Sequence, residues 1–167
     1  MNTLKKIQTR IYRAEQLYSE FSKEMLEDTR ITLLLAEYQQ AIYHTKSYFQ
    51  NTEVVEACSR CAQTNEGSCC FEGMEDNYDH ILLLINLLMG VNLPHERELN
   101  NHCLFVGNKG CKLLARYYFC VNYFCPALEN TLGEQKMNQL STVIGNEIFA
   151  GWELEQALRN WLRNKNY

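Results

Sequence analysis

Hydrophobic residues recur with a helical period along the first fifty residues. Their spacing alternates between three and four, and the series is Leu4, Ile7, Ile11, Ala14, Tyr18, Phe21 and Met25. The phase is then lost, and a second apolar stripe comprises Ile31, Leu34, Leu35, Tyr38 and Ile42. Asp28 or Thr29 between the stripes can cap a new helix. The pattern predicts a helical hairpin over residues 1–50, with one long bent helix or an oligomeric coiled coil as alternatives.

A second feature is a nearly continuous apolar run from Ile81 to Leu93. Only Asn86, Gly90 and Asn92 interrupt it. A helix that is apolar on all sides is buried, so we expect a central helix over residues 78–90. The run has thirteen residues, whereas a membrane span needs about 20, so we expect neither a membrane helix nor a membrane partner.

Helical spacing returns near the C-terminus. Two stripes are present there, and they comprise Met137, Leu140, Ile144 and Ile148, then Leu154, Leu158, Trp161 and Leu162. Gly145 and Gly151 predict a break between two helical pieces. The expected fold class is mainly α. We expect a single domain, residues 1–167. It contains a helical hairpin, a buried central helix and C-terminal helices over residues 132–165, and two Cys-rich metal-binding loops connect these helical parts.

Composition narrows the function classes. The chain has 167 residues and a net charge of −4, with 46% hydrophobic and 22% charged residues, which is typical of a folded domain. It has no basic cluster, so we expect no nucleic-acid partner. The first six residues are basic enough for a signal peptide, but no apolar segment follows them. We therefore expect a cytoplasmic protein, in which thiols stay reduced.

Cysteine is the residue type that stands out. All eight cysteines lie in two segments separated by 32 residues, and none lies in the predicted hairpin or C-terminal helices. They are Cys58, Cys61, Cys69 and Cys70 in a predicted loop over residues 51–73, and Cys103, Cys111, Cys120 and Cys125 in a second irregular region over residues 95–127. Core cysteines would be scattered. Clustered thiols in a reducing compartment are more often metal ligands than disulfides.

The local spacings add detail. Two residues separate Cys58 from Cys61, which allows both sulfurs to bind one tetrahedral ion. Neighbouring side chains diverge, so Cys69 and Cys70 should divide between two metals or span a polynuclear cluster, with a strained vicinal disulfide as the remaining option. Both segments must then meet to complete the ligand sets. His102 directly precedes Cys103, yet eight thiols already suffice for two four-ligand sites.

The full pattern of cysteines is similar to that of the YkgJ-type cysteine-cluster family, described as zinc- or iron-chelating domains. Cys103-Leu104-Phe105, a polar turn over residues 107–110, Cys111, Arg116 and Cys120-x-x-Tyr123-x-Cys125 match the second half of its motif. The chain departs from it at Tyr117 and Phe124, where the family usually has proline. The resemblance covers residues 58–126 and implies metal chelation without implying a reaction.

We therefore expect a protein that chelates zinc through its eight cysteines. An iron–sulfur protein for redox or electron transfer and a metal-dependent enzyme remain as alternatives. The chain has no nucleotide-binding loop, no H-E-x-x-H helix and no zinc-deaminase signature, so catalytic residues are unassigned. The N-terminal helices offer a surface for a protein partner.

Overall fold

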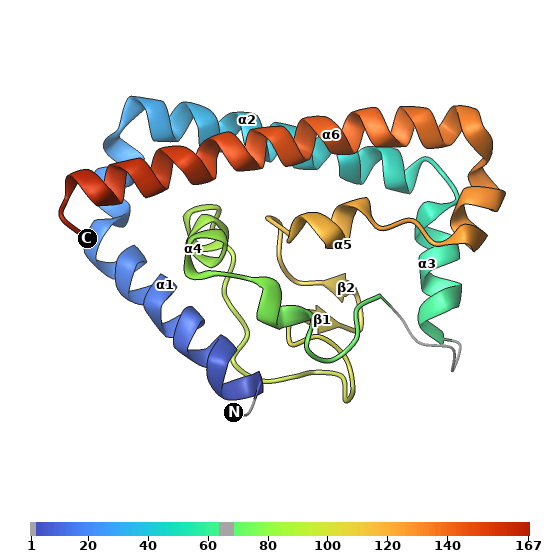
Figure 1. Ribbon diagram of the computed structural model, residues 1–167, viewed down its shortest axis with the longest axis horizontal. Helices are drawn as coiled ribbons and strands as arrows, with labels where there is room; N and C mark the ends of the chain where they lie inside the picture. Colours follow the sequence, from blue (N-terminus) through green and yellow to red (C-terminus); the bar gives the residue numbers. More distant parts are fainter. Residues whose placement is uncertain (1–2, 64–68) are drawn as a thin grey trace.

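The computed structural model describes the backbone of residues 3–63 and 69–167, and the side chains of residues 6–58 and 69–167. It is mainly helical, which confirms the predicted class (Figure 1). The helices are α1 (Thr3–Glu27), α2 (Thr29–Gln50), α3 (Val54–Gln63), α4 (His80–Leu88), α5 (Tyr118–Asn122) and α6 (Pro126–Asn164). A 3-10 turn, η1 (Met74–Asn77), and a two-stranded ribbon of β1 (Val106–Gly107) and β2 (Gly110–Cys111) lie between them.

The break between the first two helices falls at Asp28. Its side chain accepts hydrogen bonds from the backbone N–H groups of Arg30 and Ile31, at 3.0 and 3.1 Å. Such a cap stabilises a helix start by about 1 kcal/mol. The two helices then diverge, because α1 packs chiefly on α4 and α2 packs chiefly on α6 (Figure 1). The predicted hairpin is therefore an open corner whose two arms are covered by other helices.

The central helix α4 is buried, as the sequence predicts. Ile81, Leu83, Leu84 and Ile85 are all inaccessible or nearly so. Asp79 caps the helix by accepting hydrogen bonds from the Ile81 and Leu82 N–H groups, at 3.0 and 2.9 Å. Helix α1 covers one side of α4 with a stripe of fully buried residues, which comprises Ile7, Ile11, Ala14 and Leu17.

Asn86 is a fully buried polar residue of α4. Its amide donates hydrogen bonds to the carbonyl oxygens of Leu82 and Ala115, at 2.9 and 2.8 Å. Its oxygen accepts hydrogen bonds from the N–H groups of Leu114 and Ala115, at 2.9 and 3.1 Å. The extended segment before α5 is thus fixed to α4 through one side chain whose bonding capacity is nearly used up.

Helix α6 corrects the predicted C-terminal break. The helix passes without interruption through Gly145 and Gly151, and its non-helical residue is Gly133, with φ of 71° and ψ of 168°. Gly151 serves a different purpose, because a Cβ atom added there would lie 2.8 Å from Cζ of Tyr38. This glycine lets α6 approach α2 closely, and the two helices run antiparallel (Figure 1).

The first Cys-rich segment also differs from expectation. Residues 51–73 were predicted to be a loop, but residues 54–63 form α3. Threonine, asparagine, serine and glycine residues across this segment favoured the loop interpretation. In the second segment the predicted turn is confirmed, since β1 and β2 pair Val106 with Cys111 and Gly107 with Gly110.

The buried residues form two cores. The larger one joins α1, α2, α4, the segment around Phe105 and the C-terminal half of α6. The smaller one joins α3, α5 and the first half of α6, with Tyr48 and Phe49 of α2 at its edge. Among the described residues, no helix is long and apolar enough to span a membrane.

Gly145 and Gly151 allow a matched test of the α2–α6 contact. Gly145→Ala should raise the free energy of unfolding by about 0.5–1 kcal/mol, because alanine favours a helix and a Cβ there meets no other atom within 4 Å. Gly151→Ala should lower it, because the new methyl collides with Tyr38. Denaturant unfolding monitored by circular dichroism measures both. Equal stabilisation by the two substitutions would contradict the close approach.

Candidate metal centre

The two Cys-rich segments lie side by side. The Cys103 N–H donates to the Cys70 carbonyl oxygen at 2.9 Å, and the Glu72 N–H donates to the Asn101 carbonyl oxygen at 3.1 Å. Phe71 and His102 form an antiparallel bridge between these two bonds. The vicinal pair, Cys69 and Cys70, is thereby brought to the start of the segment that carries the second set of cysteines.

An ion pair reinforces this junction. The Arg97 guanidinium contacts the carboxylate of Glu75, which is fully buried, and lies 2.9 Å from the carboxylate of Glu72. It also donates to the His102 carbonyl oxygen at 3.3 Å. The other Glu75 oxygen accepts from the Gly73 N–H at 2.9 Å. The guanidinium of Arg97 therefore contacts Glu72, which follows the vicinal cysteines, and also His102, which directly precedes Cys103.

Cys120 is positioned by the buried core. It lies in α5, and the hydroxyl of Tyr78 donates to its sulfur at 3.7 Å. Tyr78 is 1% exposed and packs edge-on against Phe105 and beside Tyr117. Aromatic rings therefore lie on one side of the thiol and surround it there with apolar atoms.

Mutual electrostatic effects define a set of thiols, the five-thiol group, which comprises Cys69, Cys70, Cys103, Cys111 and Cys120. A hydrogen bond from the Cys69 thiol lowers the pKa of Cys70, whereas burial and the charges of Cys111, Cys120 and Cys103 act to raise it. Burial raises the pKa of Cys103 to about 12, and the charges of Cys111 and Cys120 act in the same direction. Burial also raises the pKa of Cys120, and desolvation of its sulfur raises that of Cys111, although Cys111 as a whole residue is exposed.

Several donors oppose these effects. The backbone of Phe105 makes a hydrogen bond that lowers the pKa of Cys103, and the backbone of Leu113 does the same for Cys111. Each donor is two residues beyond its cysteine. Arg116 adds a positive charge that acts on Cys111 and Cys120. Hydrogen-bond donors and a cation aimed at sulfur atoms favour thiolates, which are the metal-binding form of cysteine.

The ligand geometry itself is not preformed. Among the side chains that the structure describes, no three from cysteine, histidine, aspartate or glutamate converge tightly enough to hold a metal ion. The donor set nevertheless suits a thiophilic metal, since five thiols from two segments share one electrostatic environment. Coordination would require side-chain rotation within a backbone that is already joined.

The other three cysteines, Cys58, Cys61 and Cys125, belong to α3 and to the start of α6. Cys58 is exposed on α3, and Cys61 belongs to the same helix, but the predicted sharing of one metal by these two residues falls outside the described side chains. Cys125 occupies the N-cap position of α6 and packs in the smaller core together with Ala57 of α3. Cys125 is thus near the helix that carries Cys58 and Cys61.

Sequence reasoning missed Arg97, Glu75 and Tyr78. No local spacing links Arg97 to Glu75, and only the fold shows that they meet. His102 is held through Nδ1 at 2.8 Å from the Asn100 carbonyl oxygen, so its ring is engaged with its own turn.

Comparisons with known proteins found no matching family model, no similar curated protein and no similar solved structure. The resemblance to the YkgJ-type family therefore stays a prediction that rests on the cysteine spacing.

The ion pair between Arg97 and Glu75 leads to a prediction about stability. Arg97→Met should lower the free energy of unfolding by about 3–5 kcal/mol, because it leaves the buried Glu75 carboxylate without its cation. The double variant with Glu75→Gln should recover part of this loss, since the uncompensated charge is gone. Arg30→Met, at an exposed position of α2, is the control and should change little. Urea unfolding of all three compares them. An Arg97→Met variant as stable as the control would contradict the junction's role.

Proposed function

We propose that the chain binds a transition-metal ion through cysteine thiolates, with zinc as the first candidate. The observation that carries this proposal is the approach of Cys69 and Cys70 to Cys103, Cys111 and Cys120 across a hydrogen-bonded junction. Residues far apart in sequence supply thiols to one environment. Random burial of cysteines in a core gives no reason for such a gathering.

The surroundings of the five-thiol group favour the binding of a cation. Desolvation makes the thiols of Cys103, Cys111 and Cys120 hard to ionise, so several thiolates together need positive charge nearby. A divalent ion supplies that charge and displaces the thiol protons, so its affinity should increase with pH. Arg116 and the two backbone donors offset part of the negative charge that remains on a four-thiolate shell. Zinc takes this ligand type in tetrahedral geometry.

An iron–sulfur cluster is the second candidate, and two observations favour it. The five-thiol group has more sulfurs than one tetrahedral ion needs, and a cluster offers several metal positions to a vicinal pair. Tyr78 donates to the Cys120 sulfur from within an apolar shell, an arrangement that tunes the reduction potential of such clusters.

Metal analysis separates these candidates. Protein purified without oxygen should contain at least one zinc ion per chain and show no broad visible absorption. Iron and acid-labile sulfide in similar amounts, with visible charge-transfer bands, would instead identify a cluster. Absence of both metals, together with no zinc uptake by the reduced protein and full reactivity of its thiols, would contradict the proposal.

Substitutions locate the ligands. Cys103→Ser and Cys120→Ser should each lower zinc affinity by at least 100-fold, because serine replaces a soft thiolate with a poor ligand for this ion. Cys125→Ser is the comparison, since this residue lies in the smaller core, and the zinc of the five-thiol group should survive it. Competition with a chromogenic chelator measures affinity. Unchanged zinc binding in both of the first two variants would exclude the five-thiol group as the site.

A further inference from the structure

A groove of about 770 Å³ runs between α2 and α6, and no cysteine lines it. Small apolar residues are part of its lining, Ala41 from α2 with Val143 and Ala150 from α6. Gln40 and His44 stand along the α2 side, and Asn146 stands along the α6 side. This groove is independent of the proposed metal centre.

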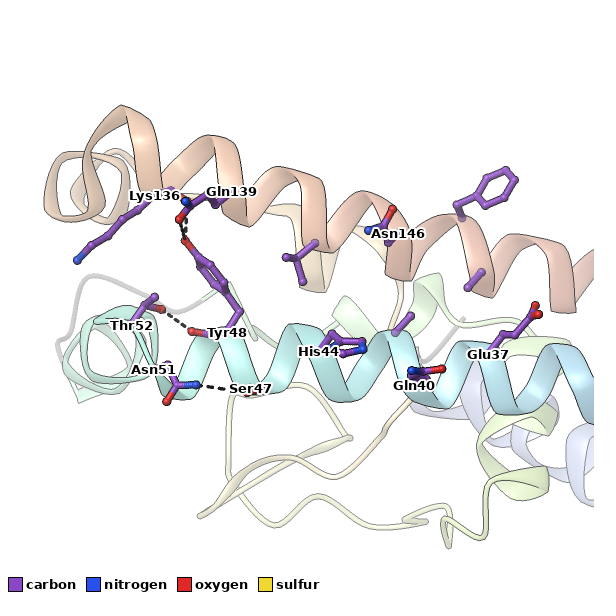
Figure 2. A pocket seen from close by; sticks show the side chains of 14 residues that line it. Glu37, Gln40, His44, Ser47, Tyr48, Asn51, Thr52, Lys136, Gln139 and Asn146 are labelled. Carbon is purple, nitrogen blue, oxygen red and sulfur yellow. Dashed lines mark hydrogen bonds between the residues drawn. The ribbon is translucent and has the colours of Figure 1, made fainter.

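The charges of the groove lie only at its ends. Among its lining residues, Glu37 and Lys136 carry formal charges, and Figure 2 shows them at opposite ends. The other lining residues are uncharged polar residues and apolar residues such as Ala41 and Val143. Depletion of charge at the centre is a feature of protein–protein interfaces. A site for phosphate or another anion would instead gather cations.

Large apolar side chains extend this surface beyond the groove. Phe149 of α6 lines it and is 58% exposed. Leu33, which is 59% exposed, lies one helical turn before Glu37 on the same face of α2. Aromatic residues are enriched in interfaces, and large exposed apolar side chains beside a groove are unfavourable in water.

We propose that this face is where two copies of the chain associate. An occupant must be long, because α2 alone has 22 residues and extends about 33 Å. It must also present a cation opposite Glu37 and an anion opposite Lys136. A second copy does both. Turned end for end about a two-fold axis across the helices, it places its Lys136 over Glu37 and its Glu37 over Lys136.

The size of the face fits a dimer. Two neighbouring helices about 33 Å long and about 20 Å wide offer roughly 660 Å² per copy, near the roughly 800 Å² of a standard interface. The product is a four-helix arrangement of two antiparallel pairs. Lys136 already lies 3.0 and 2.9 Å from the Glu53 oxygens, but an ammonium has three donors and can serve two carboxylates.

The oligomeric state tests the proposal. The full chain is examined by sedimentation equilibrium over a range of concentrations, with a reductant present because Cys58 and Cys69 are exposed and could cross-link copies. The wild-type chain should give the mass of a dimer. Ala150→Arg adds a long charged side chain to the lining of the groove and should weaken association by at least tenfold. Ser141→Arg, at an exposed position away from the groove lining, is the matched control and should leave the dimer intact.

A second pair of variants tests the orientation. Glu37→Lys should weaken the dimer, because two lysines then face each other at both ends of the interface. Glu20→Lys makes the same change of net charge at an exposed position of α1 and should have no effect. If circular dichroism shows that Ala150→Arg is unfolded, Gln40→Arg at an exposed position replaces it. A monomer at all concentrations, or a dimer that neither groove arginine weakens, would overturn the proposal. A dimer that Glu37→Lys leaves unchanged would overturn the end-for-end arrangement.

Discussion

The burial of α4 is the constraint on which the rest of the molecule depends. This short helix presents apolar side chains in nearly every direction, so other elements must cover all of it. Helix α1 covers one side and therefore turns away from α2 at Asp28. The segment that contains Leu104 and Phe105 covers another side, and both residues are fully buried. The arrangement of the helices follows from this need.

The same constraint positions the candidate metal centre. The chain that covers α4 also carries Cys103 at its start, while Asn86 fixes the segment just before Arg116 and α5. Cys103 and Cys111 therefore lie on a stretch that the core holds at both ends. Arg97 and Glu75 complete the arrangement from the other side by joining the vicinal pair to the Cys103 segment. A core requirement and a buried ion pair together gather the thiols.

The sequence predicted those features whose signals are local. The helix start after Asp28, the buried helix around Ile85 and the turn before Cys111 all depend on neighbouring residues, and the structure has them. Gly151 was misinterpreted because a glycine that ends a helix and one that admits a neighbouring side chain look alike in sequence. The contact of Arg97 with Glu75 has no local signal at all. Clustering of cysteines predicted that two segments meet, but spacing alone could not show which thiols share one environment.

The junction between the Cys-rich segments has a kinetic consequence. Many small metal-binding domains assemble their ligand strands only when the ion arrives, so uptake waits for folding and release brings unfolding. Here backbone hydrogen bonds and the Arg97 ion pair join the two segments through contacts that involve no sulfur atom. Under the proposed function, these contacts between the segments do not depend on the metal, so they persist when the metal is released.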